Sequence, residues 1–139
     1  MKKVLFDTNI ILDVLLDRDP HFDASAAAWV AVEEGEAKGF LAAHAVTTLH
    51  YLIRKDQGNA RAKNIVSELL RVFQVARVDG AVIDEALKLS FSDFEDAVTA
   101  AAARSAGCDW IVTRNPKDFR GSPVRCMTAE AAVPILSGK

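Results

Sequence analysis

Apolar and polar positions along the chain fall into two alternating patterns. Short, nearly continuous apolar runs are typical of strands buried on both faces, and longer stretches with apolar residues three or four apart predict helices. Strands are expected at Lys3–Asp7, Gly39–Ala42, Phe73–Val78, Trp110–Thr113 and Val124–Met127. Helices are expected at Ile10–Leu16, Asp23–Glu34, Val46–Lys55, Ala60–Val72, Ala81–Leu89, Asp93–Ala106 and Ala129–Leu136. This order predicts an α/β domain of three layers, α/β/α, with a central parallel sheet of about five strands.

Residues at the ends of these elements support the boundaries. Asp79 and Thr128 precede expected helices and have side chains that cap helix N-termini, whereas Gly35 and Gly107 are typical of C-terminal stops. The segment from Arg114 to Pro123 is long for a connection in a compact domain, which makes it a candidate functional loop.

Composition narrows the class of protein. The chain has 139 residues, half of them apolar and 26% charged, and neither repeats nor linkers interrupt it, so residues 1–139 are expected to form one soluble domain. Its net charge is -2, so any attraction for nucleic acid must come from a local patch. No apolar run is long enough to span a membrane, and the N-terminus does not resemble a signal peptide. Cys108 and Cys126 lie in apolar stretches, as expected of buried thiols in the cytoplasm.

Acidic and polar residues follow several of the expected strands or begin expected helices. Asp7 ends the first strand, Asp93 and Asp96 begin an alanine-rich helix, and Asn115 and Asp118 follow the Trp110–Thr113 strand. Ligands of open α/β folds bind at the carboxyl ends of parallel strands. Hard oxygen ligands without clustered histidine or thiolate favour Mg²⁺ or Mn²⁺, ions that activate water and neutralise phosphodiester charge.

Each of these residues also has an ordinary structural explanation. Ser92 and Glu95 match a capping box, with Ser92 as the N-cap, and acids in a first turn interact favourably with the helix dipole. Asn115 precedes a proline and could simply form a turn. Around Asp118, a local basic patch that could hold a phosphate backbone is formed by Arg114, Lys117, Arg120 and Arg125.

Three motifs, taken in order, resemble the PIN domain, and more narrowly the VapC-type toxin ribonucleases. They are Phe6-Asp7-Thr8-Asn9, then Asp96-Ala97 at the start of the alanine-rich helix, then the segment from Ile111 to Phe119. The resemblance implies Mg²⁺- or Mn²⁺-dependent RNA cleavage, commonly a homodimer, and a possible antitoxin partner. It also implies that Asp7 is the first acidic ligand, Asp96 the third, and Asn115 the neutral form of the fourth, with Asp93 and Asp118 as additional acids.

The sequence departs from this family at one position. The family places a glutamate in the helix after the second strand, and here that position falls near Thr48, where there is no acid. His50 lies two residues further on, roughly 200° around the helix, and is not an obvious replacement. Tyr51 and Arg54 share a face and could line a substrate groove. His21 and His44 carry no readable signal.

The leading hypothesis is a divalent-metal-dependent endoribonuclease. We expect catalytic roles for Asp7, Asp96, Asn115 and Asp118, metal ligands at Asp7, Asp93 and Asp96, and RNA contacts from Arg114, Lys117 and Arg120. The alternative is a catalytically weakened or silent PIN-like module that binds RNA or protein. A phosphatase of the haloacid-dehalogenase type is disfavoured, because Asn9 stands where that family needs a second aspartate.

Overall fold

A central parallel sheet organises the chain, as the sequence predicts. The computed structural model describes residues 1–137. Its strands are β1 (Lys3–Phe6), β2 (Lys38–Ala42), β3 (Gln74–Ala76), β4 (Trp110–Val112) and β5 (Arg125–Met127). Their order is β3-β2-β1-β4-β5, and every neighbouring pair is parallel. Strands β2 and β3 therefore lie on one side of β1, and β4 and β5 lie on its other side.

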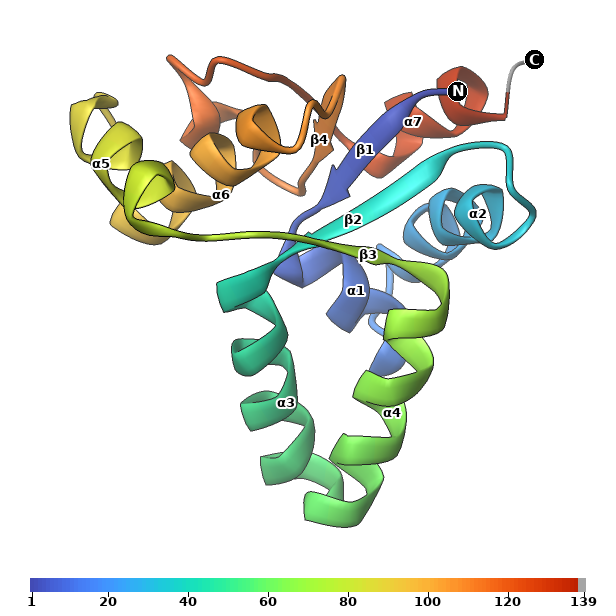
Figure 1. The fold of residues 1–139 in the computed structure, drawn as a ribbon. Helices are drawn as coiled ribbons and strands as arrows, with labels where there is room; N and C mark the ends of the chain where they lie inside the picture. The colour runs from blue at the N-terminus through green and yellow to red at the C-terminus, as the bar shows by residue number, and fades with distance from the viewer. Residues whose placement is uncertain (138–139) are drawn as a thin grey trace.

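Helices cover both faces of this sheet, which confirms the three-layer α/β/α prediction (Figure 1). They are α1 (Thr8–Leu15), α2 (Phe22–Glu33), α3 (Ala43–Gln57), α4 (Asn59–Val72), α5 (Gly80–Lys88), α6 (Phe94–Ser105) and α7 (Ala129–Leu136), with one 3₁₀ turn, η1 (Pro116–Phe119). The expected loop from Arg114 to Pro123 thus contains η1. Within residues 1–137, none of the helices combines the length and the apolar character that crossing a bilayer requires.

The sheet divides the apolar interior into two cores. Val4 and Phe6 face one core together with residues of α1, α2 and α7, while Leu5 faces the other with residues of α5 and α6. This alternation follows from the two-residue repeat of a strand. On the second face, α6 contributes a run of buried alanines, Ala100–Ala103, whose small side chains leave little bulk between helix and sheet. The register that results brings the N-terminus of α6 to the carboxyl edge of the strands.

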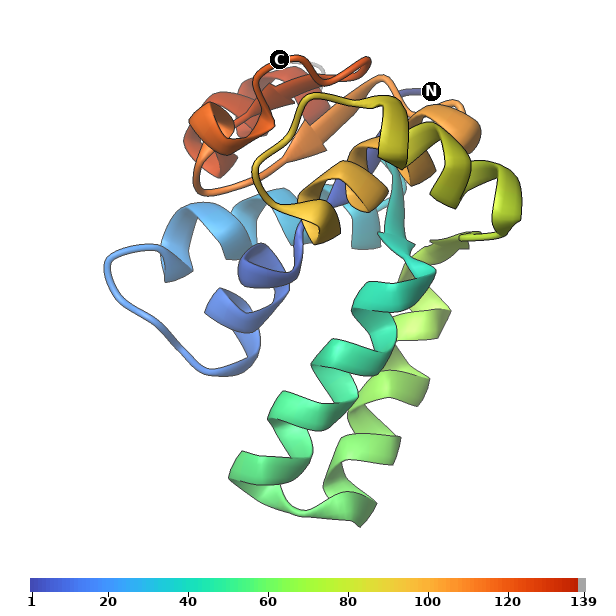
Figure 2. The same cartoon turned by 90° about the vertical axis from the view of Figure 1, so that its left-hand side faces the viewer.

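The pair α3 and α4 extends away from the sheet as a helical hairpin (Figure 2). Leu49 and Ile53 of α3 are fully buried, and so are Ala62 and Leu69 of α4. Helix α3 begins at Ala43, three residues before the predicted start, because the chain enters the helix directly from β2 without a side-chain cap. This early start places the first turn of α3 at the carboxyl edge of the sheet.

Most predicted helix ends are confirmed, and one is wrong. Asp79 and Thr128 cap α5 and α7, and Gly35 and Gly107 have the positive φ angles of C-terminal stops, 77° and 74°. The N-cap of α6, however, is Asp93 and not Ser92: the Asp93 carboxylate accepts a hydrogen bond from the Asp96 amide at 3.0 Å. Aspartate and serine cap helices about equally well, so the sequence alone did not separate the two positions.

Candidate active site

Asp7 lies at the point where the order of the strands reverses. It follows β1, between β2 on one side and β4 on the other, and crevices at such points are where open α/β sheets bind ligands. Its carboxylate accepts hydrogen bonds from the Thr8 amide and from the Thr113 hydroxyl, both at 2.9 Å. Burial raises the pKa of Asp7, and these two hydrogen bonds oppose that shift. The carboxylate is therefore oriented by neutral donors and retains unused acceptor capacity.

A pocket of about 190 Å³ opens beside Asp7. The first turns of α1, α3 and α6 form its walls, and these helix starts meet near the centre of Figure 2. Helix N-termini carry partial positive charge, so three of them favour acidic side chains or a bound anion at this place. The residues lining the pocket are Asp7, Thr8, Asn9, His44, Ala45, Thr48, Glu95, Asp96 and Thr99. Of the predicted acids, Asp7 and Asp96 share this pocket.

Asp96 is the acid most strongly perturbed by its surroundings. Its pKa is raised to about 7, first by burial and then by the negative charges of Asp93, Asp7, Asp118 and Glu95. Within residues 1–137, neither Asp7 nor Asp96 forms a salt bridge. Acids that remain unpaired with a cation at a sheet edge are typical of functional sites.

The donor set fits a hard divalent cation. Mg²⁺ is usually held by one or two carboxylates, several waters and the phosphates of a substrate, and Asp7 and Asp96 supply such a pair of carboxylates. Among the described residues, no group of three or more histidine, cysteine or acidic side chains could hold a metal ion. The described residues therefore offer two carboxylates in this pocket and no closed set of protein ligands of the kind that a structural metal site needs.

The remaining predicted acids and Asn115 surround this pocket but do not line it. Asp93 caps α6 and contributes its charge to the field at Asp96. Asp118, on η1, is exposed and also acts on Asp96 through its charge. The backbone N–H of Asn115 donates to the Thr113 hydroxyl at 3.3 Å, and that hydroxyl donates to Asp7. Asn115 is thus linked to Asp7 through one shared side chain.

The four predicted cations do not form the single basic patch that the sequence suggests. The Arg114 guanidinium binds both carboxylate oxygens of the buried Asp13, so it is engaged inside the protein. Lys117 and Arg120 are exposed and lie outside the pocket lining. Arg125 begins β5, at the amino edge of the sheet, with its guanidinium over the Trp110 ring. Of the four predicted cations, Lys117 and Arg120 are therefore the two that are exposed on or beside η1, the element that carries Asp118.

His44 is a pocket residue to which sequence reasoning assigned no role. Its Nε2 lies 3.3 Å from the Thr99 hydroxyl, and its buried Nδ1 has no hydrogen-bond partner in the described part of the chain. Burial lowers the pKa of His44, and the charges of Glu95 and Asp7 oppose this shift. Its place directly after the second strand was a usable signal, because that position shares the sheet edge of Asp7. Glu95, predicted only as a helix cap, also lines the pocket.

Thr48 lies one turn beyond His44 in the pocket wall. Its hydroxyl donates to the His44 carbonyl at 3.4 Å. An acid at this position of α3 would therefore have been part of the pocket lining, as the family resemblance implied. Here the wall between His44 and Thr48 has no carboxylate.

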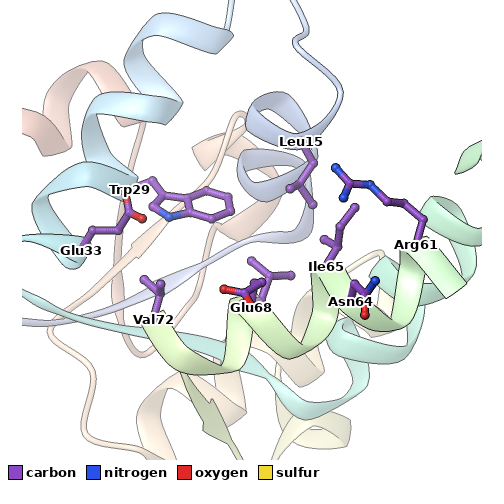
Figure 3. A pocket seen from close by; sticks show the side chains of 9 residues that line it. Leu15, Trp29, Glu33, Arg61, Asn64, Ile65, Glu68 and Val72 are labelled. Atoms are coloured by element: carbon purple, nitrogen blue, oxygen red, sulfur yellow. The ribbon is translucent and has the colours of Figure 1, made fainter.

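A second hollow, of about 250 Å³, lies between α1, α2 and α4 (Figure 3). Trp29, Leu15 and Ile65 form an apolar floor, while the charged groups of Arg61 and Glu68 lie at its edge. None of the acids around Asp7 lines it. This hollow has the apolar floor and charged rim of a contact surface, in contrast to the acidic pocket.

Comparison with known proteins agrees with this architecture. Residues 3–117 match the family described as PIN domain, and the chain therefore belongs to the PIN domain family. No protein with a curated function matches the sequence.

Similar solved structures come from toxin–antitoxin systems. The DNA-bound VapBC complex of Salmonella typhimurium aligns with a TM-score of 0.70 and 17% identity, covering 93% of this chain and 99% of the other. FitAcB of Neisseria gonorrhoeae aligns with a TM-score of 0.67 and 21% identity, covering 91% and 97%. VapC20 of Mycobacterium tuberculosis, a sarcin-ricin loop cleaving toxin, aligns with a TM-score of 0.60 and 16% identity, covering 78% and 86%. At these identities the likeness establishes a shared fold.

Proposed function

We propose that this protein is a divalent-metal-dependent endoribonuclease and the toxin of a toxin–antitoxin pair. The observation that carries the proposal is the pair Asp7 and Asp96, two partly buried carboxylates in one pocket of a PIN domain that form no salt bridge within residues 1–137. Structural neighbours that include a toxin cleaving the sarcin-ricin loop make RNA the favoured substrate.

In this proposal each residue has a defined part. Asp7 and Asp96 hold Mg²⁺ or Mn²⁺, with Asp93 and Asp118 adding negative charge at the edge of the site. The ion supplies charge neutralisation for a phosphodiester and lowers the pKa of water. Thr113 fixes the orientation of the Asp7 carboxylate and, through its contact with the Asn115 amide, holds the start of the Asn115–Asp118 segment beside it. Lys117 in this segment and Arg120 two residues after it then contact the RNA backbone.

The direct test is cleavage of an end-labelled single-stranded RNA in Mn²⁺, with EDTA as the metal-free control. Asp96→Asn preserves the shape of the side chain while removing its charge, so cleavage should disappear and the fold should persist. Asp23→Asn removes a similarly placed acid from the first turn of α2 and should cleave normally. Full Mn²⁺-dependent cleavage by the Asp96→Asn variant would contradict the assignment.

One observation favours a second candidate, a catalytically silent module. Thr48 occupies the pocket wall where the family resemblance implies an acid. A silent module would bind RNA or protein without cleaving RNA. Calorimetric titration with Mn²⁺ separates the two candidates: binding that disappears in Asp96→Asn supports the nuclease, and no binding at millimolar metal supports the silent module.

We also propose an antitoxin-like protein partner, because the similar structures include the VapBC complexes. The hollow in Figure 3 suits an amphipathic segment of that partner, with apolar residues on Trp29 and Ile65 and charged residues beside Arg61 and Glu68. A small protein encoded by a neighbouring reading frame is the candidate to purify with this chain. In a Trp110→Phe background its binding should change Trp29 fluorescence, and Ile65→Asp should weaken the complex. We also propose that the chain forms a homodimer, whose mass light scattering tests, and that it is cytoplasmic.

A further inference from the structure

One face of α3 connects the acidic pocket to the exposed hairpin. His44 and Thr48 line the pocket, and Tyr51 and Lys55 follow at intervals of three and four residues. Residues with this spacing lie in one stripe along a helix. We call these four residues the α3 stripe. At 1.5 Å per residue, Tyr51 lies roughly 10 Å along the helix from His44, within reach of nucleotides next to a phosphate held in the pocket.

The outer half of the stripe combines an exposed aromatic ring with cations. Tyr51 is 49% exposed, although it is a large aromatic residue in the middle of a helix. The Lys55 ammonium lies 5.4 Å from the centre of its ring, and the Arg54 guanidinium 5.7 Å. Neither cation forms a salt bridge with any residue in the described part of the chain. Both positive charges are therefore available to a ligand at the ring.

Packing within the protein does not account for Tyr51. The buried face of α3 consists of Ala45, Leu49 and Ile53, which point away from the side of the helix that carries Tyr51. The ring contributes to neither of the two apolar cores. An exposed aromatic ring flanked by basic residues is the arrangement on which single-stranded nucleic acids stack their bases.

The charge of the hairpin supports a polyanionic ligand. Residues 43–72 contain five lysines or arginines and two acids, whereas the whole chain has a net charge of -2. The single acid of α3, Asp56, lies beyond Lys55 at the end of the helix. Local positive charge in an otherwise acidic protein concentrates the attraction for RNA on this arm.

We propose that the α3 stripe, together with the neighbouring Arg54, is the binding track for single-stranded RNA, with one base stacked on Tyr51 and its neighbouring phosphates held by Arg54 and Lys55. This inference rests on the proposed nuclease function, because it assigns the path of the substrate on one side of the acidic pocket. It predicts a preference for unpaired RNA, since a base in a duplex is not free to stack on a protein ring.

The test measures binding separately from cleavage. Fluorescence anisotropy of a labelled single-stranded RNA is recorded in EDTA with the full chain carrying Asp96→Asn, so that no cleavage competes. Adding Tyr51→Ala should weaken binding about ten-fold, because one stacked base is lost. Tyr51→Phe retains the ring and should stay within about two-fold of the parent. Leu70→Ala removes a side chain of similar exposure, 47%, from α4 and is the matched control.

Salt dependence tests the cations. For a single strand, each phosphate contact contributes about 0.7 to the slope of log affinity against log salt concentration, so Arg54→Gln with Lys55→Gln should reduce the slope by about 1.4. The control pair is Lys38→Gln with Lys88→Gln, two exposed cations that lie at the amino edge of the sheet and on α5. That pair should leave the slope unchanged.

Several results would overturn the track. One is absence of RNA binding by the Asp96→Asn parent, and another is equal RNA binding by this parent and its Tyr51→Ala derivative. A third is a change in mass of the Tyr51→Ala derivative, measured by light scattering, while its RNA affinity is intact, which would make the stripe a protein interface. Failure of the proposed nuclease function gives a different result from failure of the RNA track. A wild-type chain that never cleaves RNA, but loses RNA affinity through Tyr51→Ala, contradicts the proposed function and supports the track.

Discussion

Two acids of the first 13 residues have opposite environments. Asp13 is fully buried, its carboxylate bound by the Arg114 guanidinium and by the Ser25 hydroxyl at 3.1 Å. Asp7, six residues earlier, accepts only from neutral hydrogen-bond donors among residues 1–137 and lines the same pocket as Asp96. A buried carboxylate whose charge is paired with a cation has a structural role. A partly buried carboxylate without a counterion is typical of a site that binds a ligand. The two acids are therefore distinguished by the groups that bind their carboxylates and not by their position in the sequence.

The largest effect is expected when the paired site is broken. Arg114→Met should lower the free energy of unfolding by about 3–5 kcal/mol, because it leaves the buried Asp13 charge uncompensated. Chemical denaturation measures the change. The double variant Asp13→Leu with Arg114→Met removes both charges and should recover most of the loss. A cost below about 1 kcal/mol for Arg114→Met would show that Arg114 is free for another role, including the predicted RNA contact.

Breaking the unpaired site should affect activity and spare the fold. Asp7→Asn should reduce Mn²⁺-dependent RNA cleavage at least about a hundred-fold, because a carboxylate that holds the ion is lost. Asparagine also caps helices well, so α1 should keep its start and the free energy of unfolding should not fall. Cleavage at the wild-type rate would remove Asp7 from the site.

The pH dependence of stability sharpens the same contrast. The pKa of Asp96 rises from 3.8 to about 7 on folding, so without metal the folded state binds a proton that the unfolded state releases. Stability associated with this group is therefore present below 3.8 and is lost as pH rises to about 7. Asp96→Asn should remove that loss. At high pH its free energy of unfolding should therefore exceed that of the wild type by about 1 kcal/mol, after allowance for solvent screening. Thermal unfolding at several pH values tests the sign.

The smallest effect separates the two roles of Asp93. Asp93→Ser keeps a side chain that caps α6, so the free energy of unfolding should change by less than about 0.5 kcal/mol. If Asp93 is also a metal ligand, the same variant should weaken Mn²⁺ binding measured by calorimetry. Unchanged affinity would leave Asp93 as a cap whose charge acts on Asp96 from outside the ligand set.

The sequence predicted correctly those features of the site that depend only on residues close together along the chain. A carboxylate directly after an apolar run placed Asp7 at a strand end, and an acid before an alanine-rich stretch placed Asp96 at a helix start. The pair of Asp13 and Arg114 joins residues 101 positions apart and depends on β1 lying next to β4, which no local pattern specifies. His44 was missed for a related reason: its helix begins three residues earlier than its apolar periodicity indicates.

The hairpin has a consequence for how this protein can vary between relatives. Helices α3 and α4 are joined by Gly58 alone, with a φ of 88° that favours glycine. Insertions of whole turns in both helices would lengthen the arm while leaving the pocket wall and the sheet in place. The arm can therefore change in length and charge at little risk to folding, so that the surface it presents can vary between relatives while the acidic pocket stays the same.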